Sequence, residues 1–339
     1  HVGARIAPLV GAEPDCVVAA DSTTVNLFKV VSAAVSLRPE RTKIVTETRN
    51  FPTDNYIAEG VIRQCGNRHR LVHVDRPQDI AAAIDDDTAV LMLTHVNYRD
   101  GSLHDMADLT RAAHDAGALV VWDLAHSAGA LRVDLAGCHA DFAVGCGYKY
   151  LNGGPGAPAF LYVAPRHHGG FRQPLSGWFG HRDPFEFTPQ YDAAGDIGQY
   201  LCGTPPVLSM VALDAALDVW DGVNITALRA KSQALTGYFI ELVETRCAGH
   251  GLTLISPRDP EARGSQVSFT HAQGGYAIIS ALIADGVIGD FRAPDVLRFG
   301  FTPLYTSFAD VWHAVDRMAA ILDEHRWDKP EFHARKAVT

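Results

Sequence analysis

Cysteine is scarce in this chain, and the few cysteines lie far apart. The 339 residues include six, at positions 16, 65, 138, 146, 202 and 247, and no two of them have CxxC spacing. Disulfide frameworks and structural zinc sites need cysteines in close, regular groups, so the sequence predicts neither of them and no metal centre. We expect all six to be reduced thiols, most of them buried.

Long apolar runs and an excess of basic charge are also lacking. No stretch approaches the roughly 20 apolar residues of a membrane-spanning helix, and no signal peptide heads the chain. The 29 basic and 39 acidic residues give a formal charge of −10, which disfavours nucleic acid or an anionic membrane as a partner. The cytoplasm is therefore the expected location. The chain opens at His1 on a stretch typical of a domain interior, so we expect a further segment upstream of it.

The chain has enough apolar sequence for a large core, arranged as alternating strands and helices. Hydrophobic residues make up 47% of it. Strands are expected at 17–19, 43–46, 71–74, 89–93, 119–122, 142–144 and 159–163, with helical patterns between most of them, including one near 77–85. This alternation predicts an α/β fold with a mostly parallel central sheet. The length favours two domains, which we place at 1–210 (large, cofactor-binding) and 211–330 (small, α+β), before a polar tail at 331–339.

Two of the predicted strands lead to charged residues that suit one cofactor. Asp123 follows the apolar run 119–122, and Lys149 follows the run 142–144 after a turn that contains glycine. Open parallel sheets bind ligands at the carboxyl ends of their strands. Pyridoxal phosphate fits this pair, because its aldehyde forms a Schiff base with a lysine amine and its ring nitrogen seeks a carboxylate. Taken alone, a helix-start aspartate and a surface lysine are the commoner explanation; the neighbouring sequence favours the cofactor.

That neighbouring sequence is specific. Residues 148–156 read YKYLNGGPG, and residues 122–129 read WDLAHSAG. With these motifs nearly the whole chain resembles the kynureninases, which are pyridoxal-phosphate-dependent enzymes of the aspartate aminotransferase fold type, fold type I. The resemblance implies a hydrolase that cleaves a carbon–carbon bond of L-kynurenine, releasing anthranilate and L-alanine. The 3-hydroxy form of the substrate, which gives 3-hydroxyanthranilate, stays open. Such a reaction belongs to tryptophan catabolism by the kynurenine pathway and to NAD biosynthesis.

The resemblance also gives roles to the residues around the central pair. Lys149 would hold the cofactor and move the proton on the substrate Cα, while Asp123 keeps the ring nitrogen protonated. His126 would position that carboxylate or pack at the ring. Tyr148 would bind the phosphate and supply a proton.

Two turns after earlier strands complete the expected cofactor site. The resemblance places phosphate-binding hydroxyls at Thr23 and Thr24, where a helix is predicted to begin; simple helix capping explains these residues equally well. Phe51 and Asp54 belong to an FPTD motif, in which the aromatic ring stacks on the cofactor and the aspartate lies in the pocket. An ordinary core phenylalanine is the alternative for Phe51.

The last site residues lie in the irregular segment 165–205 and in the small domain. In kynureninases the motifs around Trp178 and Thr204 reach the phosphate of the partner subunit, so the resemblance implies a homodimer with a shared active site. Thr204, where some relatives carry asparagine, favours kynurenine over its 3-hydroxy form. Arg298 lies in an apolar strand, where an unpaired guanidinium is costly. The resemblance assigns it to the substrate α-carboxylate, and an internal salt bridge is the alternative.

Two other functions are compatible with these features. A cysteine desulfurase or class V aminotransferase has the same fold and the same aspartate–lysine pair. A desulfurase needs a nucleophilic cysteine on a mobile loop, and none of the six lies in an evident Gly/Ser-rich loop. A non-catalytic oligomer that keeps the fold without turnover is the alternative of another class.

Overall fold

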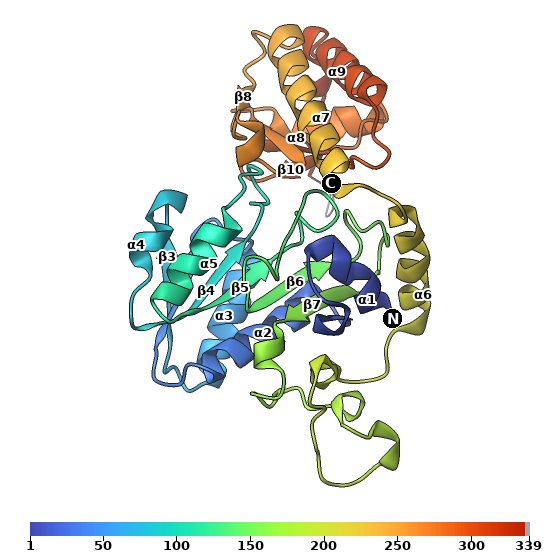
Figure 1. The fold of residues 1–339 in the computed structure, drawn as a ribbon. Coiled ribbons are helices and arrows are strands. Elements are labelled where there is room, and N and C mark those ends of the chain that lie inside the picture. The colour runs from blue at the N-terminus through green and yellow to red at the C-terminus, as the bar shows by residue number, and fades with distance from the viewer. Residues whose placement is uncertain (336–339) are drawn as a thin grey trace. The chain divides into compact units, whose positions relative to one another are not determined.

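The computed structural model describes residues 1–335, and the chain forms two compact units (Figure 1). The large unit comprises His1–His95 and His104–Val223, and the small unit comprises Val96–Leu103 and the chain from Asn224 onward. The expected tail at 331–339 is described as far as Arg335, and its last four residues lie outside the described part. Between residues 1 and 335, no helix combines the length and the apolar character needed to cross a membrane.

A seven-stranded sheet organises the large unit, in the order β1-β7-β6-β5-β4-β2-β3. Neighbouring strands from β6 to β3 run parallel, whereas β7 is antiparallel to both β6 and β1. The predicted α/β fold with a mostly parallel sheet is confirmed. The strands are β1 (Val17–Ala19), β2 (Lys43–Glu47), β3 (Arg70–Val74), β4 (Thr88–Thr94), β5 (Leu119–Asp123), β6 (Phe142–Cys146) and β7 (Ala159–Val163).

Six α-helices accompany this sheet. They are α1 (Val2–Ile6), α2 (Thr23–Ser36), α3 (Pro52–Gln64), α4 (Ile80–Ala83), α5 (Met106–Asp115) and α6 (Val207–Ala216). α2 packs on β6 and β7, and α5 packs on β5. The apolar residues of α2 recur every three or four positions, which buries one face against the sheet: Leu27, Val30, Val31 and Ala34 are 0% exposed.

The helix expected near 77–85 was predicted too long. The structure has a 3-10 turn at Pro77–Asp79 and only the four residues of α4. The three aspartates that follow cannot extend an apolar face, and the Asp85 carboxylate instead accepts a hydrogen bond from the Asp87 N–H at 3.1 Å. Aspartate favours such turns because its short side chain binds the local backbone.

An antiparallel sheet with the order β10-β11-β9-β8 organises the small unit. Its strands are β8 (Thr253–Leu254), β9 (Gln266–Thr270), β10 (Asp290–Arg292) and β11 (Val296–Gly300). Its helices are α7 (Ile225–Arg246), α8 (Gly275–Ala284), α9 (Phe308–Asp323) and α10 (Pro330–His333). The sequence did not predict β10, which offers one apolar residue between two charged ones.

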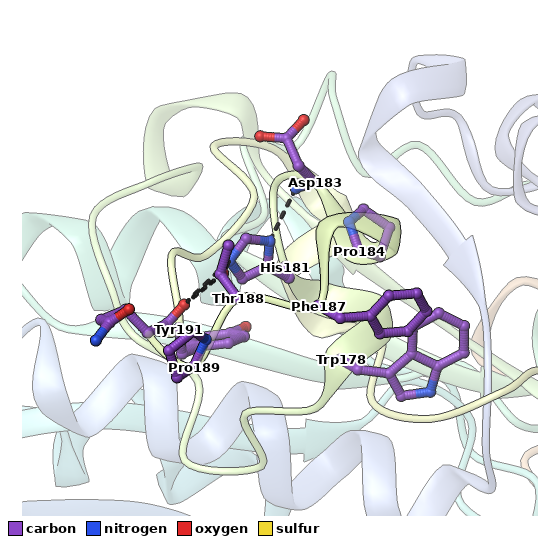
Figure 2. A pocket seen from close by; sticks show the side chains of 9 residues that line it. Trp178, His181, Asp183, Pro184, Phe187, Thr188, Pro189 and Tyr191 are labelled. Carbon is purple, nitrogen blue, oxygen red and sulfur yellow. Dashed lines mark hydrogen bonds between the residues drawn. The ribbon is translucent and has the colours of Figure 1, made fainter.

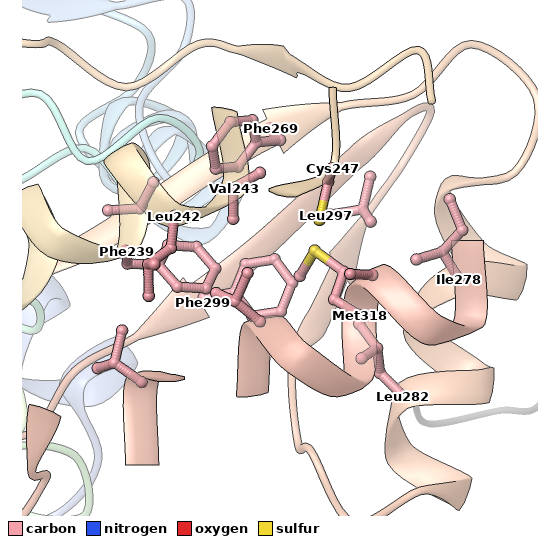
Figure 3. Close-up of a cluster of buried hydrophobic side chains, with 14 of the residues drawn as sticks. Phe239, Leu242, Val243, Cys247, Phe269, Ile278, Leu282, Leu297, Phe299 and Met318 are labelled. Carbon is pink, nitrogen blue, oxygen red and sulfur yellow. The ribbon is translucent and has the colours of Figure 1, made fainter. Parts of the chain in front are cut away.

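The core of the small unit forms where three helices meet this sheet. Figure 3 shows side chains from α7, α8, α9, β9 and β11 converging in one cluster. Phe239 of α7 is 1% exposed, and its ring centroid lies 5.0 Å from that of Phe299 and 5.1 Å from that of Phe301. Burying a side chain of this size contributes roughly 2–3 kcal/mol, so these aromatic contacts stabilise the unit.

Candidate active site

β5 and β6 bring the central acid and the lysine to one edge of the large sheet. Both strands are buried and parallel, with Val121–Asp123 paired to Phe142–Val144. Asp123 is the last residue of β5 and is 4% exposed. Its Oδ1 accepts a hydrogen bond from the Ala125 N–H at 2.7 Å. The apolar strand therefore carries a carboxylate into the protein interior and ends there.

Lys149 meets the turn that follows β5. The chain leaves β6 through Gly147, where a Cβ would lie 2.4 Å from the carbonyl oxygen of Pro158, so only glycine allows this close approach. Two residues later, the Lys149 Nζ lies 3.1 Å from the His126 Nε2 and 5.6 Å from the ring centroid of Tyr148. The structure thus brings together three of the predicted residues around one amine.

A second buried carboxyl group interacts with Asp123. Asp54, in the first turn of α3, is 2% exposed. Burial and the charge of Asp123 raise the pKa of Asp54 well above its ordinary value, and a Thr94 hydrogen bond and the Lys149 amine oppose this shift. Burial also raises the pKa of Asp123, against the effects of Lys149 and of its backbone hydrogen bond. A cation beside these acids would favour their ionised forms, which is what the protonated ring nitrogen of pyridoxal phosphate offers, so the acids fit this cofactor.

A polar network supports Asp54 from the side of β4 and β2. The Thr94 hydroxyl hydrogen-bonds the Asn50 side-chain oxygen and lies 3.4 Å from Oδ2 of Asp54. The Asn50 amide donates to the Thr46 hydroxyl at 3.1 Å. None of these three supporting residues was among the predicted site residues. Their shared signal is that each lies in or just beyond the last two positions of a buried parallel strand.

The turn between β1 and α2 is an accessible helix start. Ser22, not a threonine, is the N-cap, and its hydroxyl accepts from the Val25 N–H at 3.3 Å. Thr23 and Thr24 open the helix, whose first turn contains no acidic residue. A helix start of this kind attracts anions through its N–H groups and its dipole. Phe51 occupies the corresponding N-cap position of α3 and is 38% exposed, so it is not part of the hydrophobic core.

Trp178 lies in the irregular segment that projects from the large unit (Figure 1). Its ring centroid lies 4.9 Å from that of Phe179, 5.6 Å from that of Phe185 and 6.2 Å from that of Phe187. Figure 2 shows Trp178 and Phe187 together on one side of a pocket of about 260 Å³. Thr204 is exposed further along the segment. Trp178, Phe185 and Phe187 contact one another and are exposed to solvent.

Arg298 is ion-paired within the small unit. It lies in β11 with its side chain 12% exposed, and its Nη2 donates to the Asp290 carboxylate of β10. Its Nη1 donates to the carbonyl oxygen of Tyr98 at 2.6 Å. Arg292 binds the same Asp290 oxygen at 2.7 Å. These bonds form the internal salt bridge that was the alternative for Arg298.

Sequence comparison decides between the possible families. The profile of the kynureninase C-terminal domain matches residues 228–318, and that of the DegT/DnrJ/EryC1/StrS aminotransferase family matches residues 4–144. The chain is 53% identical to a kynureninase of Pseudomonas fluorescens and to one of Burkholderia mallei, over 100% of its own length and 82% of theirs. The chain belongs to the kynureninase family. Kynureninases are hydrolases that use pyridoxal phosphate, so the predicted family, enzyme class and cofactor are confirmed.

Solved structures show that the chain has the fold type I architecture of pyridoxal-phosphate-dependent enzymes. The chain matches a cysteine desulfurase of Thermococcus onnurineus with a TM-score of 0.82 at 20% identity, over 95% of this chain and 83% of that one. It also matches a C-DES variant that has glycine covalently linked to its PLP cofactor. The TM-score is 0.79 at 17% identity, over 94% of this chain and 84% of that one. At such identities the likeness concerns the fold alone, and the fold prediction is confirmed.

Proposed function

We propose that this chain hydrolyses L-kynurenine to anthranilate and L-alanine, using pyridoxal phosphate held by Lys149. The observation that carries the proposal is the placement of the Lys149 amine 3.1 Å from His126, at the sheet edge where the buried Asp123 ends β5. Identity of 53% with kynureninases over the whole chain supports the substrate class. The 3-hydroxy form is the alternative substrate.

Several residues would hold the cofactor. Asp123 is suited to bind the ring nitrogen, because its carboxylate is buried and its pKa is raised by that burial, so a cationic partner stabilises it. Thr23 and Thr24, at the start of α2, are suited to the phosphate. The exposed phenol of Tyr148 would bind the same phosphate, and the half-exposed ring of Phe51 would stack on the cofactor.

The chain's own groups would handle the protons. Bound pyridoxal phosphate supplies an electron sink for the bonds broken at the substrate. The Lys149 amine would take the proton from the substrate Cα and return it elsewhere on the reacting system. His126, at hydrogen-bond distance from that amine, would orient it. Asp54 lies beside Asp123, and burial and the charge of Asp123 raise the pKa of Asp54 well above its ordinary value.

Arg298 is the proposed group for binding the substrate carboxylate. A guanidinium matches a carboxylate in two parallel hydrogen bonds. Arg298 is already charge-balanced by Asp290, so an incoming carboxylate would have to share the guanidinium with that residue or replace it. We therefore expect an Asp290→Asn substitution to lower the KM for kynurenine, because it removes the competing charge.

A homodimer in the cytoplasm is the proposed working form. Apolar side chains are exposed along the projecting segment and α6: Phe185 is 72%, Phe187 76%, Val207 60% and Leu208 89% exposed. Large apolar side chains that are exposed to solvent often mark protein–protein interfaces. In the homodimer that the resemblance implies, Trp178 and Thr204 would lie near the partner's phosphate. Light scattering should give twice the chain mass, and Leu208→Asp should shift it toward the monomer.

The decisive test of the function is Lys149→Ala. The wild-type protein should show the absorbance of lysine-bound cofactor and release fluorescent anthranilate from kynurenine, and the variant should lose both. Lys329→Ala, at an exposed lysine, is the matched control and should keep both. Turnover by Lys149→Ala at the wild-type rate would contradict the lysine assignment. Sulfide release from cysteine, with no anthranilate from kynurenine, would instead favour a desulfurase.

A further inference from the structure

Lys29 is a fully buried charge beside the turn that opens α2. Its side chain is 0% exposed, and its Nζ lies 2.5 Å from the Asp21 carboxylate and 2.5 Å from the carbonyl oxygen of Tyr200. A buried ammonium group is very costly unless it is paired and hydrogen-bonded. The two partners therefore explain why a lysine is stable at this position.

Each partner belongs to a segment that the proposed function assigns to a cofactor phosphate: the turn of Asp21 to the phosphate of its own subunit, and the segment of Tyr200 to that of the partner subunit. Asp21 lies two residues before Thr23, and its φ of +47° is left-handed, a conformation that residues other than glycine adopt mainly with support. Tyr200 ends the 3-10 turn Ile197–Tyr200, four residues before Thr204. One ammonium group thus joins the turn at the start of α2 to the segment that leads to Thr204.

The same part of α2 also holds the earlier part of the projecting segment. The Gln173 side chain donates to the backbone carbonyl of Lys29 at 3.4 Å. Phe179, next to Trp178, donates its N–H to the carbonyl oxygen of Cys202 at 3.1 Å. The turn that contains Trp178 is therefore tied to the chain just beyond the Lys29 contact.

We infer that Lys29 is a positioning residue for the cofactor phosphate, an inference that rests on the proposed function. Its ammonium neutralises Asp21, whose carboxylate would otherwise repel a phosphate dianion at the adjacent helix start. Its second hydrogen bond fixes the segment leading to Thr204 against that turn. Removal of the ammonium leaves a carboxylate without its partner beside the phosphate and breaks the link to Tyr200.

Titration of the cofactor-free protein separates this role from general stability. The dissociation constants of pyridoxal phosphate and of pyridoxal, which lacks the phosphate, are measured by absorbance for the wild type and for Lys29→Met. We expect Lys29→Met to raise the dissociation constant of pyridoxal phosphate by about tenfold, the equivalent of one charge-assisted contact. The dissociation constant of pyridoxal should rise by less than about twofold. An unchanged ratio of the two constants would overturn the inference.

Lys43 provides a matched control. Its side chain is 8% exposed, and its Nζ lies 2.5 Å from the Asp85 carboxylate and 2.7 Å from the carbonyl oxygen of Ala83. It is the first residue of β2, at the amino end of the sheet, whereas the cofactor residues lie at the carboxyl end. Lys43→Met should lower the melting temperature and leave the ratio of the dissociation constants of pyridoxal phosphate and pyridoxal within about twofold of the wild-type ratio. A change of that ratio as large as in Lys29→Met would also overturn the inference.

A double variant keeps the test decisive if Lys29→Met does not fold. Lys29→Met with Asp21→Asn removes both charges, so no uncompensated ion stays buried. The link to Tyr200 is still lost, so we expect the dissociation constant of pyridoxal phosphate, but not that of pyridoxal, to rise by about threefold, less than in the single variant. A wild-type ratio in the double variant would refute the inference when the single variant is unfolded. Failure of the wild-type protein to bind either compound would instead contradict the proposed function.

Discussion

Asp141 offers the sharpest test of how the large unit is stabilised. It directly precedes β6, is 1% exposed, and each of its two oxygens accepts two hydrogen bonds. Oδ1 accepts from Arg166 at 2.6 Å and from His167 at 2.8 Å. Oδ2 accepts from His114 and from the Val120 N–H, both at 2.8 Å. Burial alone would raise the pKa of Asp141, but these donors outweigh it and hold the pKa well below its ordinary value.

The expected loss of stability in Asp141→Asn follows from the hydrogen bonds that asparagine can still make. Asp141→Asn keeps one acceptor oxygen and turns an NH₂ group toward two donors, so two hydrogen bonds to a charged group are lost. Each is worth about 1.5–3 kcal/mol, and breaking a buried charged network costs about 3–5 kcal/mol. The side chains of Arg166 and His114 are 44% and 32% exposed, so water can take the place of some of the lost hydrogen bonds and reduce the loss of stability. We therefore expect a loss of about 3 kcal/mol in the free energy of unfolding near pH 7.

The pH dependence has a definite sign. Because the folded-state pKa lies below the unfolded value of about 3.9, the carboxylate stabilises the fold above that value, and the contribution is lost as the pH falls through the folded-state pKa. Urea unfolding followed by tryptophan fluorescence should show the wild type and Asp141→Asn converging below about pH 4. Asp108→Asn, at a side chain that is 61% exposed, should change stability by less than about 0.5 kcal/mol. A loss below about 1 kcal/mol at pH 7 for Asp141→Asn would refute the reasoning.

Three further outcomes follow from single contacts. In the cofactor-free protein, Asp54→Asn should gain stability relative to wild type as the pH rises above about 4, because the raised pKa of Asp54 makes its ionisation destabilising; parallel pH–stability curves would contradict this. Ser307→Ala should cost about 1 kcal/mol in urea unfolding of the small unit, because Ser307 and Asp310 form the capping box of α9, and Ser307→Asp should restore most of it. Gly177→Ala should increase proteolysis of the projecting segment, because its Cβ would lie 2.1 Å from the Cys202 carbonyl oxygen; wild-type resistance would show that the segment adjusts freely.

The sequence alone determined the elements and the residue types at their ends. Apolar runs of three to five residues predicted the parallel strands, and the positions that follow two of these runs predicted Asp123, the last residue of β5, and Lys149, after β6. Such patterns are local, because the period of apolar residues and the first residues of a turn depend on a few neighbours. The motifs around Lys149 then sufficed for the family, which the identity of 53% over the whole chain confirms.

Only the tertiary structure decided which polar groups share a buried environment. Asp290, in a strand that the sequence did not predict, pairs with Arg298. Asp54 meets Asp123, and Lys29 reaches Tyr200, through contacts between residues distant in sequence. The energy of a buried charge depends on the partners that packing brings to it, and those partners are not encoded in the periodicity of its own element.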